Sequence, residues 1–399
     1  MGQRVLFTAS TASHIRNFHL PYLRHFQELG WEVDVACGAP AEHIPGADRV
    51  IPLPFRKKLT APANFRAAAI LRREMKRAPY DLVITHTSLA SFFTRLALPQ
   101  GTRRPKVVNM VHGYLFNESS PGLKGRLLMW AEALTARRTD LVLTMNQADY
   151  AFAQSHQLGK RVELVPGVGV DFFQLDESLA RAEIDLRSDE ALAAWLEGEI
   201  DESIAREKAT LRRILNIPQD AFVFLYAAEF SKRKNQALLI RALAQLPQQA
   251  MLALPGQGAQ YQACCDLVRE LGLWDRVLLP GHVSDMGPWY ALADAAVSAS
   301  YSEGLPFNIM EAMYAGLPIA ATAVKGHTDL LEPSEAGLLF PPDDPGLCAG
   351  AMGRLLADPQ LRHRLSKAAH QAVLPYGLDQ VLPQVMERYL SLVPTPVAV

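Results

Sequence analysis

Short apolar runs alternate with longer helical patterns along almost the whole chain, and this alternation limits the possible folds more than any other feature. The first half contains the runs "RVLF", "EVDVA", "DLVIT", "KVVNMV", "LVLT" and "VELV". After residue 215 the pattern starts again with "FVFLYAA", "MLALP", "RVLLP", "AAVSAS", "PIAATAV" and "GLLFP". Apolar strands that alternate with helices are typical of parallel sheets covered on both faces. The sequence therefore predicts an α/β protein built from two doubly wound, Rossmann-like domains.

The length of the chain, 399 residues, also exceeds what one ordinary core holds. We expect an N-terminal domain over 1–170, a linker with an acidic helical insertion over 171–214, a second domain over 215–377, and a C-terminal helix and tail over 378–399 that pack back toward the N-terminal domain. The insertion contains 11 acidic and 3 basic residues between Asp176 and Glu207. A solvated helical linker and a surface that docks a partner are alternative interpretations of this charge.

Charge and cysteine content exclude several classes of protein. The formal net charge of −1 gives no overall attraction to nucleic acid or to an anionic membrane, so any such attraction must be local. The four cysteines show no C-x-x-C spacing, which fits a reducing compartment. No apolar run approaches the roughly 20 residues that span a bilayer, and the first residues lack the pattern of a signal peptide. We expect a cytoplasmic protein without a nucleic-acid partner.

Histidine, lysine and glycine residues directly follow several of the predicted strands. His86 follows "DLVIT", and His112 follows "KVVNMV". The segments "EFSKRKN" and "GQG" follow "FVFLYAA" and "MLALP", and "AAVSAS" leads into "YSEGLPFNIMEAM". Ligands of doubly wound sheets bind outside the carboxyl ends of the strands. These segments are therefore the first candidates for a functional site.

The stretch "SEGLPFNIMEAM" places Glu303 and Glu311 eight positions apart. The proline within it suits the first turn of a helix, which we predict over Pro306–Ala315 with a stop at Gly316. A catalytic carboxylate pair, a metal site and a grip on a polyhydroxylated ligand are three competing explanations. The start of a helix favours an anion such as phosphate, and carboxylates beside a phosphate are unfavourable unless each binds hydroxyl groups. We therefore favour the grip on a ligand that has sugars on both sides of a phosphate, which describes a nucleotide sugar.

The longer stretch "SEGLPFNIMEAMYAGLPIAATAVKGHTDLL", followed by "AGLLFPPDD", closely resembles the donor-site signature of family 4 glycosyltransferases with the GT-B fold. The resemblance continues upstream through "FVFLYAAEFSKRKNQALLIRAL", "LALPGQGAQYQ" and "HGYLFNESSPGLKGRLLMWAEALTARRTDLVLT", which look like members that assemble bacterial polysaccharides. It covers most of the chain apart from the acidic insertion. It implies two Rossmann-like domains that face a central cleft, with the acceptor side in the N-terminal domain and the donor site in the second.

The resemblance implies roles for residues of the donor domain. Glu303 would hold hydroxyl groups of the donor sugar, Glu311 would hold the ribose diol, and Lys234 would neutralise the diphosphate. Of these, Glu303 and Lys234 are expected to be catalytic, together with His112, which would face the donor from across the cleft. Further donor-binding positions implied by the motifs are Lys232, Arg233, Gly256, Gly258, His282, Val283, Gly304, Leu305, Pro306 and Phe307.

The chain departs from the family pattern at two places. The family commonly has an arginine five residues before the lysine, where this chain has Glu229, and an acid beside a diphosphate is unfavourable. The glycine-rich loop after the first strand is replaced by "TASTASHIRN". Residues of that segment could meet the acceptor, although an ordinary helix cap explains them equally well. The acceptor-side candidates are Ser13, His14, Asn17 and His86.

Other site chemistries lack their sequence patterns. There is no D-x-D, and His14, His19 and His25 do not have the i, i+4 spacing of a helical zinc site. The segment "GQGAQY" lacks the third glycine of a dinucleotide fingerprint, and a ribose contact for Glu311 excludes a glycosidase-like acid pair. We therefore expect neither a metal ion nor a cofactor.

The resemblance, together with these patterns, implies a retaining glycosyltransferase. It would move a hexose or N-acetylhexosamine from a nucleoside-diphosphate sugar, with a UDP-sugar favoured, to a saccharide or lipid-linked acceptor in cell-envelope polysaccharide synthesis. The apolar and basic segment "GLKGRLLMW", with the basic region 54–79, would contact an anionic membrane peripherally, unless its apolar residues are core and its bases solvated. A nucleotide-sugar 2-epimerase and a non-catalytic nucleotide-sugar-binding subunit are the alternatives. The sequence does not specify the base, the sugar, the acceptor or the linkage.

Overall fold

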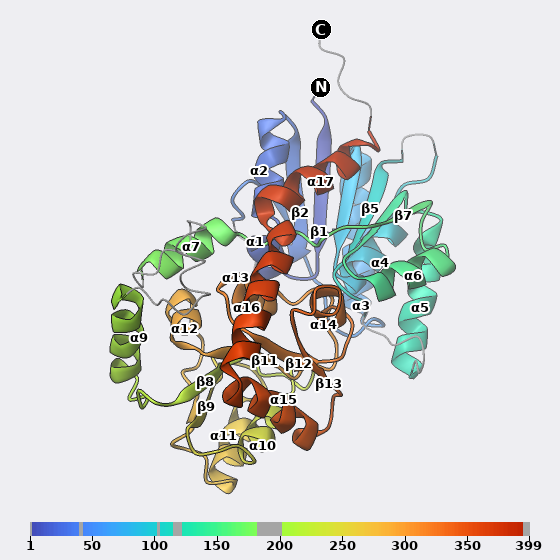
Figure 1. Cartoon of the computed structure of the whole chain (residues 1–399). Helices are drawn as coiled ribbons and strands as arrows, with labels where there is room; N and C mark the ends of the chain where they lie inside the picture. Colours follow the sequence, from blue (N-terminus) through green and yellow to red (C-terminus); the bar gives the residue numbers. More distant parts are fainter. Residues whose placement is uncertain (1, 40–42, 102–103, 115–121, 182–201, 394–399) are drawn as a thin grey trace. The chain divides into compact units, whose positions relative to one another are not determined.

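The chain folds into two compact units, each built around one parallel sheet (Figure 1). The first unit contains Met1–Gly169 and Asp379–Val399, and the second contains Val170–Leu378. The predicted α/β class with two doubly wound sheets is confirmed. The computed structural model describes residues 2–39, 43–101, 104–114, 122–181 and 202–393.

The sheet of the first unit has seven parallel strands in the order β3-β2-β1-β4-β5-β6-β7. Their inner residues are buried apolar side chains such as Val5, Leu6 and Phe7 in β1, as expected for strands covered on both faces. The strands are β1 Arg4–Ala9, β2 Glu32–Gly38, β3 Arg49–Leu53, β4 Leu82–His86, β5 Lys106–Val111, β6 Leu141–Thr144 and β7 Arg161–Leu164.

The helices of this unit include one from the C-terminal end of the chain, α17. Its Tyr389 packs against Tyr22 and Phe26 of α2, with ring centroids 6.2 and 6.3 Å apart, and its Arg388 lies 3.3 Å from a carboxylate oxygen of Glu163 in β7. The helices are α1 Ala12–Phe18, α2 Leu20–Glu28, α3 Pro62–Arg77, α4 Ser88–Ala97, α5 Leu123–Ala136, α6 Gln147–Ser155 and α17 Leu378–Leu390.

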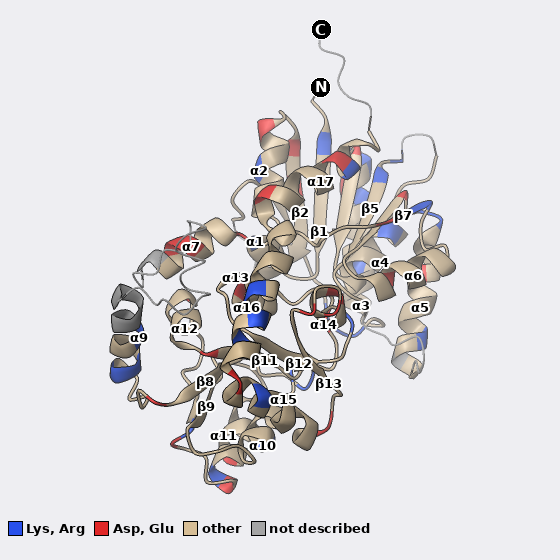
Figure 2. Cartoon of the chain, viewed as in Figure 1, with Lys and Arg blue, Asp and Glu red and all other residues tan. Residues whose placement is uncertain are grey.

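The sheet of the second unit has six parallel strands in the order β10-β9-β8-β11-β12-β13. These strands consist of apolar or small residues. Lysine and arginine residues lie on the surrounding helices, for example on α16, where they are blue in Figure 2. The strands are β8 Phe222–Leu225, β9 Ala250–Ala253, β10 Val277–Leu278, β11 Ala295–Ser298, β12 Ile319–Thr322 and β13 Gly337–Phe340.

Two helices of the segment predicted as a linker, α7 and α9, pack against α12 within the second unit. Ser178 of α7 hydrogen-bonds with Asp285 and accepts from the backbone N of Gly287 at 2.9 Å. The rest of the acidic insertion, 182–201, lies outside the described residues. The helices of this unit are α7 Phe172–Arg181, α9 Glu202–Ile214, α10 Gln236–Leu243, α11 Tyr261–Glu270, α12 Gly287–Leu292, α13 Phe307–Tyr314, α14 His327–Leu331, α15 Pro345–Ala357, α16 Pro359–Val373 and the 3₁₀ turn η1 Leu374–Tyr376.

Both sheets reverse their strand order at one point, between β1 and β4 in the first unit and between β8 and β11 in the second. At such a switch point the loops after the two neighbouring strands diverge to opposite faces and leave a crevice at the carboxyl edge. Residues that follow β1 and β4, and residues that follow β8 and β11, are therefore the ones that the fold places best for binding.

Candidate functional site

Glu303 is the centre of a charged group in the second unit. It lies in the loop after β11 and is only 7 % exposed. Arg233 Nη1 donates to its Oε2 at 2.8 Å, and Lys234 Nζ donates to its Oε1 at 2.7 Å. Both cations come from the loop between β8 and α10. The two loops that leave the switch point thus bring together three of the residues predicted for the donor site.

This group is strongly charged for its burial. Burial alone would raise the pKa of Glu303, but Lys234 and Arg233 hold that pKa below its ordinary value, so the carboxylate is ionised. Burial lowers the pKa of Lys234, and the attraction of Glu303 opposes this effect. Two cations and one anion leave a net charge of +1 on these three side chains, and water screens the buried pair Lys234–Glu303 less than Arg233, whose side chain is 43 % exposed. An anion with several charges would interact strongly with both cations.

Helix α13 begins beside this group, where the sequence predicts it. Pro306 is its N-cap, the helix covers Phe307–Tyr314, and Gly316 follows with a φ of 73°. The prediction of a helix over Pro306–Ala315 is thus confirmed to within one residue at each end. A proline N-cap has no side-chain group that could cap the backbone N–H groups of the first turn, and such a turn favours anions.

Glu311 lies inside α13 and has a different environment from Glu303. Its carboxylate accepts a hydrogen bond of 2.6 Å from the hydroxyl of Tyr290, which is buried in α12. Burial raises the pKa of Glu311, and the hydrogen bond from Tyr290 only partly opposes this effect. The two carboxylates therefore differ in protonation behaviour, because Glu303 is held by two cations and Glu311 by a neutral phenol.

Gly256 and Gly258 allow two backbone segments to approach each other closely. Their φ angles are +148° and +153°. A Cβ at Gly256 would lie 2.0 Å from the carbonyl oxygen of Ala228, and one at Gly258 would lie 2.4 Å from that of Phe230. Both contacts are with the segment that leads from β8 to Lys234. The glycines therefore position the backbone that carries the cations.

The other residues predicted to bind the donor divide into two groups by exposure. Leu305, Phe307 and Val283 are half-buried and pack against the core of the second unit. His282 and Lys232 are exposed. The first group is therefore held by packing, and the second is accessible from solvent.

Glu229, the departure from the family pattern, is exposed. Its charge lies close enough to Lys234 to raise the pKa of that amine slightly, against the larger effect of burial. It therefore helps to keep Lys234 protonated, although it stands where the family commonly has a cation.

A buried histidine that the sequence argument missed, His327, lies next to this group. A Cβ at the preceding Gly326, whose φ is +83°, would lie 2.8 Å from the carbonyl oxygen of Gly304, so this backbone packs directly against the Glu303 loop. Nδ1 of His327 donates to a β12 carbonyl at 2.9 Å, and its Nε2 has no partner within the described part of the chain. Burial lowers its pKa to about 4, with Glu303 opposing. His327 begins α14, after the loop 323–326 that follows β12, so its position in the sequence alone does not select it.

The first unit brings four histidines together at the carboxyl edge of its sheet. His14 and His19 come from the segment after β1, His86 ends β4, and His112 follows β5. One ring nitrogen of each lies within 4.8 Å of one from every other. Spacing along the chain relates His14 and His19 as metal ligands only to His25, so it does not predict this cluster. His86 and His112 had been recognised separately, by their positions after strands.

Two other acceptor-side candidates, Ser13 and Asn17, are exposed on α1. Thr11 is the N-cap of this helix, since its hydroxyl accepts from the backbone N of His14 at 3.3 Å, and Ser13 Oγ donates to the Thr11 hydroxyl at 3.1 Å. The helix-cap explanation therefore applies to Thr11 and to Ser13, which bonds to it, whereas Asn17 lies in the last turn of α1, away from the cap.

A hollow of about 240 Å³ lies beside the histidines. His14 and His112 line one part of it, and Asn109 and Glu132 line another. Glu132 is buried and accepts from Arg95, which is fully buried, at 2.7 Å. A polar cavity with a satisfied ion pair in its wall can hold a polar ligand or water.

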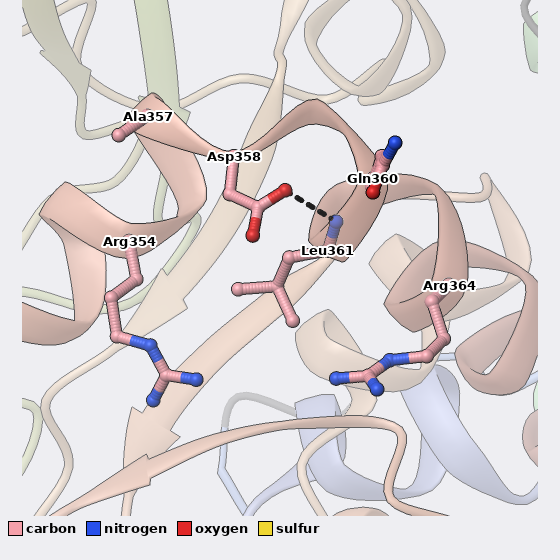
Figure 3. A pocket seen from close by; sticks show the side chains of 6 residues that line it. All are labelled: Arg354, Ala357, Asp358, Gln360, Leu361 and Arg364. Carbon is pink, nitrogen blue, oxygen red and sulfur yellow. Dashed lines mark hydrogen bonds between the residues drawn. The ribbon is translucent and has the colours of Figure 1, made fainter.

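A larger surface hollow, of about 480 Å³, lies between α15 and α16 (Figure 3). Arg354 and Arg364 reach into this region from the two helices. Asp358 between them accepts from the backbone N of Leu361 at 2.9 Å and so caps α16. None of the predicted site residues lines this hollow, and its carboxylate already has a structural function.

Two family models together match most of the chain. Residues 22–171 match the model described as Glycosyltransferase Family 4, and residues 207–372 match Glycosyl transferases group 1. The chain belongs to the family 4 glycosyltransferases. This chain therefore has a GT-B fold, and it is a retaining glycosyltransferase that uses nucleotide-sugar donors.

Individual relatives agree with this family. EpsD of Bacillus subtilis (strain 168), a protein named as a glycosyltransferase, is 29 % identical over 395 residues, which cover 98 % of this chain and 97 % of EpsD. The lipopolysaccharide core biosynthesis glycosyltransferase LpsE of Rhizobium meliloti (strain 1021) is 32 % identical over 169 residues, or 42 % of this chain and 49 % of LpsE. The structure of Anabaena HepE in complex with UDP-glucose superposes with a TM-score of 0.72 at 21 % identity, covering 97 % of this chain and 99 % of HepE.

Proposed function

We propose that this enzyme moves a hexose or an N-acetylhexosamine from a UDP-sugar to a hydroxyl group of a lipid-linked saccharide during the synthesis of a cell-envelope polysaccharide. The observation that carries the proposal is the pair of cations, Lys234 and Arg233, that converge on buried Glu303 beside the start of α13. HepE, a structural neighbour, is solved with UDP-glucose, and LpsE is named for lipopolysaccharide core biosynthesis. These relatives support the choice of donor and of pathway class.

The main barrier of this reaction is the separation of charge between an oxocarbenium-like sugar and a departing diphosphate. Lys234, Arg233 and the amides of the first turn of α13 would stabilise the leaving group, which is usually the largest single contribution to catalysis. A bound diphosphate would compete with Glu303 for the two cations and release the carboxylate toward the hydroxyl groups of the sugar. The diphosphate itself would accept the proton of the attacking hydroxyl.

The remaining predicted residues complete the proposed site. Glu311, oriented by Tyr290, would accept hydrogen bonds from the ribose diol, and the exposed loop of His282 would lie along the base. In the first unit, Ser13 and Asn17 would meet the saccharide, and His112 keeps its predicted catalytic role.

A panel of nucleotide sugars tests the donor. UDP-sugars should raise the thermal unfolding temperature more than GDP- or ADP-sugars, because a ligand that binds only the native state stabilises it by mass action. NMR of the UDP-sugar with a lipid-linked acceptor should then show transfer with retention. Isomerised donor in the absence of acceptor would identify a 2-epimerase, and binding without either transfer or slow donor hydrolysis would identify a non-catalytic subunit.

Glu311→Ala should weaken the binding of UDP about 10- to 150-fold, since a hydrogen bond to a charged group contributes roughly 1.5–3 kcal/mol. Calorimetry with wild type and variant measures this change. Because burial raises the pKa of Glu311, the wild type should also lose affinity as the pH falls through that raised pKa and the carboxylate is protonated. Glu311→Gln should lack this acidic decline. Equal UDP affinity of wild type and both variants would rule out the ribose contact.

We propose further that α5 rests on an anionic membrane. Leu123, Leu127, Trp130 and Leu134 are spaced by four, three and four residues, so they form one stripe, and Leu123 is 88 % and Trp130 55 % exposed. An exposed apolar stripe on a helix is typical of interfacial binding. Helix α3 adds the exposed bases Arg73, Lys76 and Arg77. No helix among the described residues is both long and apolar enough to cross a bilayer.

Reversal of charge in Arg73, Lys76 and Arg77 to Glu should weaken binding to anionic vesicles by about 100-fold or more, because each base near such a surface contributes roughly 1 kcal/mol. Sedimentation with phosphatidylserine vesicles at low and high salt measures this effect. The matched control reverses three exposed bases of the second unit, Arg354, Arg364 and Lys367. Equal sedimentation of wild type and the α3 variant would show that these three bases face solvent and do not contribute to membrane binding.

A further inference from the structure

The ring nitrogens of the histidine cluster are spaced as ligands of one metal ion would be. Nε2 of His14 lies 3.3 Å from Nε2 of His19 and 3.3 Å from Nε2 of His112, and Nδ1 of His86 lies 3.2 Å from that same His112 nitrogen. Zinc binds imidazole nitrogens at about 2.0–2.1 Å, so the corners of a tetrahedral site are roughly 3.3–3.4 Å apart. The three observed separations match three of the six edges of such a tetrahedron, and the other ring-nitrogen pairs lie within 4.8 Å.

Hydrogen bonding does not account for these three contacts. A neutral imidazole nitrogen has either one proton or one lone pair in the ring plane, so it makes one good hydrogen bond. Nε2 of His14 and Nε2 of His112 each have two nitrogen neighbours. Only the pairs His14–His19 and His86–His112 could be hydrogen-bonded at once, and the third contact, between His14 and His112, would remain without a proton. A common cation would use all four lone pairs.

The protonation state of the cluster suits metal binding. His19 and His86 are completely buried, and the rings of His14 and His112 are half-buried. Burial lowers the pKa of all four imidazoles, and for His19, His86 and His112 the neighbouring histidines lower the pKa further. Burial thus favours neutral imidazole, which is the form that binds metals.

We propose that His14, His19, His86 and His112 bind one divalent first-row transition-metal ion, with zinc the best fit. Imidazole nitrogens suit zinc, copper, iron and nickel, and a tetrahedral arrangement of four such ligands favours zinc. Four protein ligands fill the coordination sphere, which is the arrangement of structural zinc sites, whereas catalytic zinc keeps a position for water or substrate.

The ion would fix the segment that replaces the glycine-rich loop of the family. His14 lies in the first turn of α1 and His19 is its C-cap, whereas His86 and His112 are anchored at the ends of β4 and β5. Coordination would thus attach α1, with its exposed Ser13 and Asn17, to the carboxyl edge of the sheet. Binding through Nε2 also leaves the proton of His112 on Nδ1, so the metal would select the tautomer of a residue that the sequence predicts to be catalytic.

Cobalt binding to the full-length chain tests the proposal. After removal of metals with a chelator, the wild type should bind one Co²⁺ per chain with the intense visible absorption of tetrahedral cobalt, and Zn²⁺ should displace it. His14→Gln should weaken this binding by more than about 100-fold, beyond the roughly 10- to 100-fold effect of changes around a metal ligand. The matched control is His25→Gln on α2, whose ring is partly exposed and pairs with Glu28. This control should bind Co²⁺ like the wild type.

A measurement on the wild type alone covers the case in which a variant fails to fold. Zinc K-edge absorption should show four imidazole rings at about 2.0–2.1 Å. No tetrahedral spectrum in the wild type, equal Co²⁺ binding in all three proteins, or a zinc shell without histidine scattering would overturn the proposal. None of these readouts depends on UDP binding to the second unit, so the metal site and the proposed function can fail separately.

Discussion

Lys234→Ala should lower kcat by about 10²–10³-fold, because the loss of one preorganised donor to the charge that develops in a transition state has an effect of this size. The structure gives the physical reason. Lys234 donates to Glu303 at 2.7 Å, and burial lowers its pKa against the attraction of that carboxylate, so an anion with more charge than Glu303 would stabilise the ammonium further. A departing diphosphate is the anion that would stabilise it most. Steady-state kinetics with a UDP-sugar and a saccharide acceptor measure the change.

Two controls separate leaving-group stabilisation from simple destabilisation. Lys367→Ala removes an exposed amine from α16 of the same unit and should leave kcat unchanged. Thermal unfolding of Lys234→Ala shows whether the loss of one partner of Glu303 disturbs the fold, and Arg233 remains to hold the carboxylate. Full activity of a folded Lys234→Ala enzyme would contradict the assignment of Lys234 to the leaving group.

The fold was predictable because its signals are local. Each strand of the second unit is a short run of apolar or small residues between helices, and such runs belong to parallel sheets. Helix α13 was predicted to within one residue at each end, since Pro306 and Gly316 are strong start and stop signals. Family membership, inferred from the motif around this helix, was confirmed by the family models.

The contacts of the site were less predictable, because they join residues far apart in the sequence. The motif resemblance predicts that Glu303 binds the donor sugar and that Lys234 binds the diphosphate. Nothing in the sequence indicates that these two side chains, 69 positions apart, form an ion pair. The same limit hid His327, which is recognisable only once β12 is known to lie beside β11. The resemblance to family motifs identifies the residues of a site, whereas the order of the strands in the sheet determines which of these residues are in contact.

The histidine cluster illustrates this limit most clearly. The spacing rule for a helical zinc site requires two histidines at positions i and i+4 of one helix, and His14 and His19 do not have this spacing. The cluster arises because β1, β4 and β5 are consecutive neighbours in the sheet, so the residues at their carboxyl ends meet. The strand-end rule had already selected His86 and His112 separately. A prediction of the strand order would have been needed to bring them together with the segment after β1.

Glu132→Gln should destabilise the first unit by about 3–5 kcal/mol, because it leaves the guanidinium of Arg95 buried without its anion. Arg95 has no exposed surface, its Nη2 donates to Glu132 at 2.7 Å, and the Glu132 side chain is only 5 % exposed. The substitution keeps the size of the side chain, so loss of charge rather than loss of packing causes the effect. Urea unfolding, with hydrogen exchange of the amides in α4 and β5, measures the change and locates it.

The same substitution at an exposed ion pair is the control. Glu32 pairs with Arg4 at 2.7 Å in the same unit, but its side chain is 52 % exposed. Water screens that pair, so Glu32→Gln should cost no more than about 1 kcal/mol, and less at high salt. Replacement of both buried partners, in Arg95→Met with Glu132→Leu, should recover most of the stability, since buried ion pairs are often no better than apolar residues of similar volume. If Glu132→Gln costs no more than Glu32→Gln, the buried charge of Arg95 does not depend on Glu132 for its stability. In that case the double variant should have no higher free energy of unfolding than Glu132→Gln.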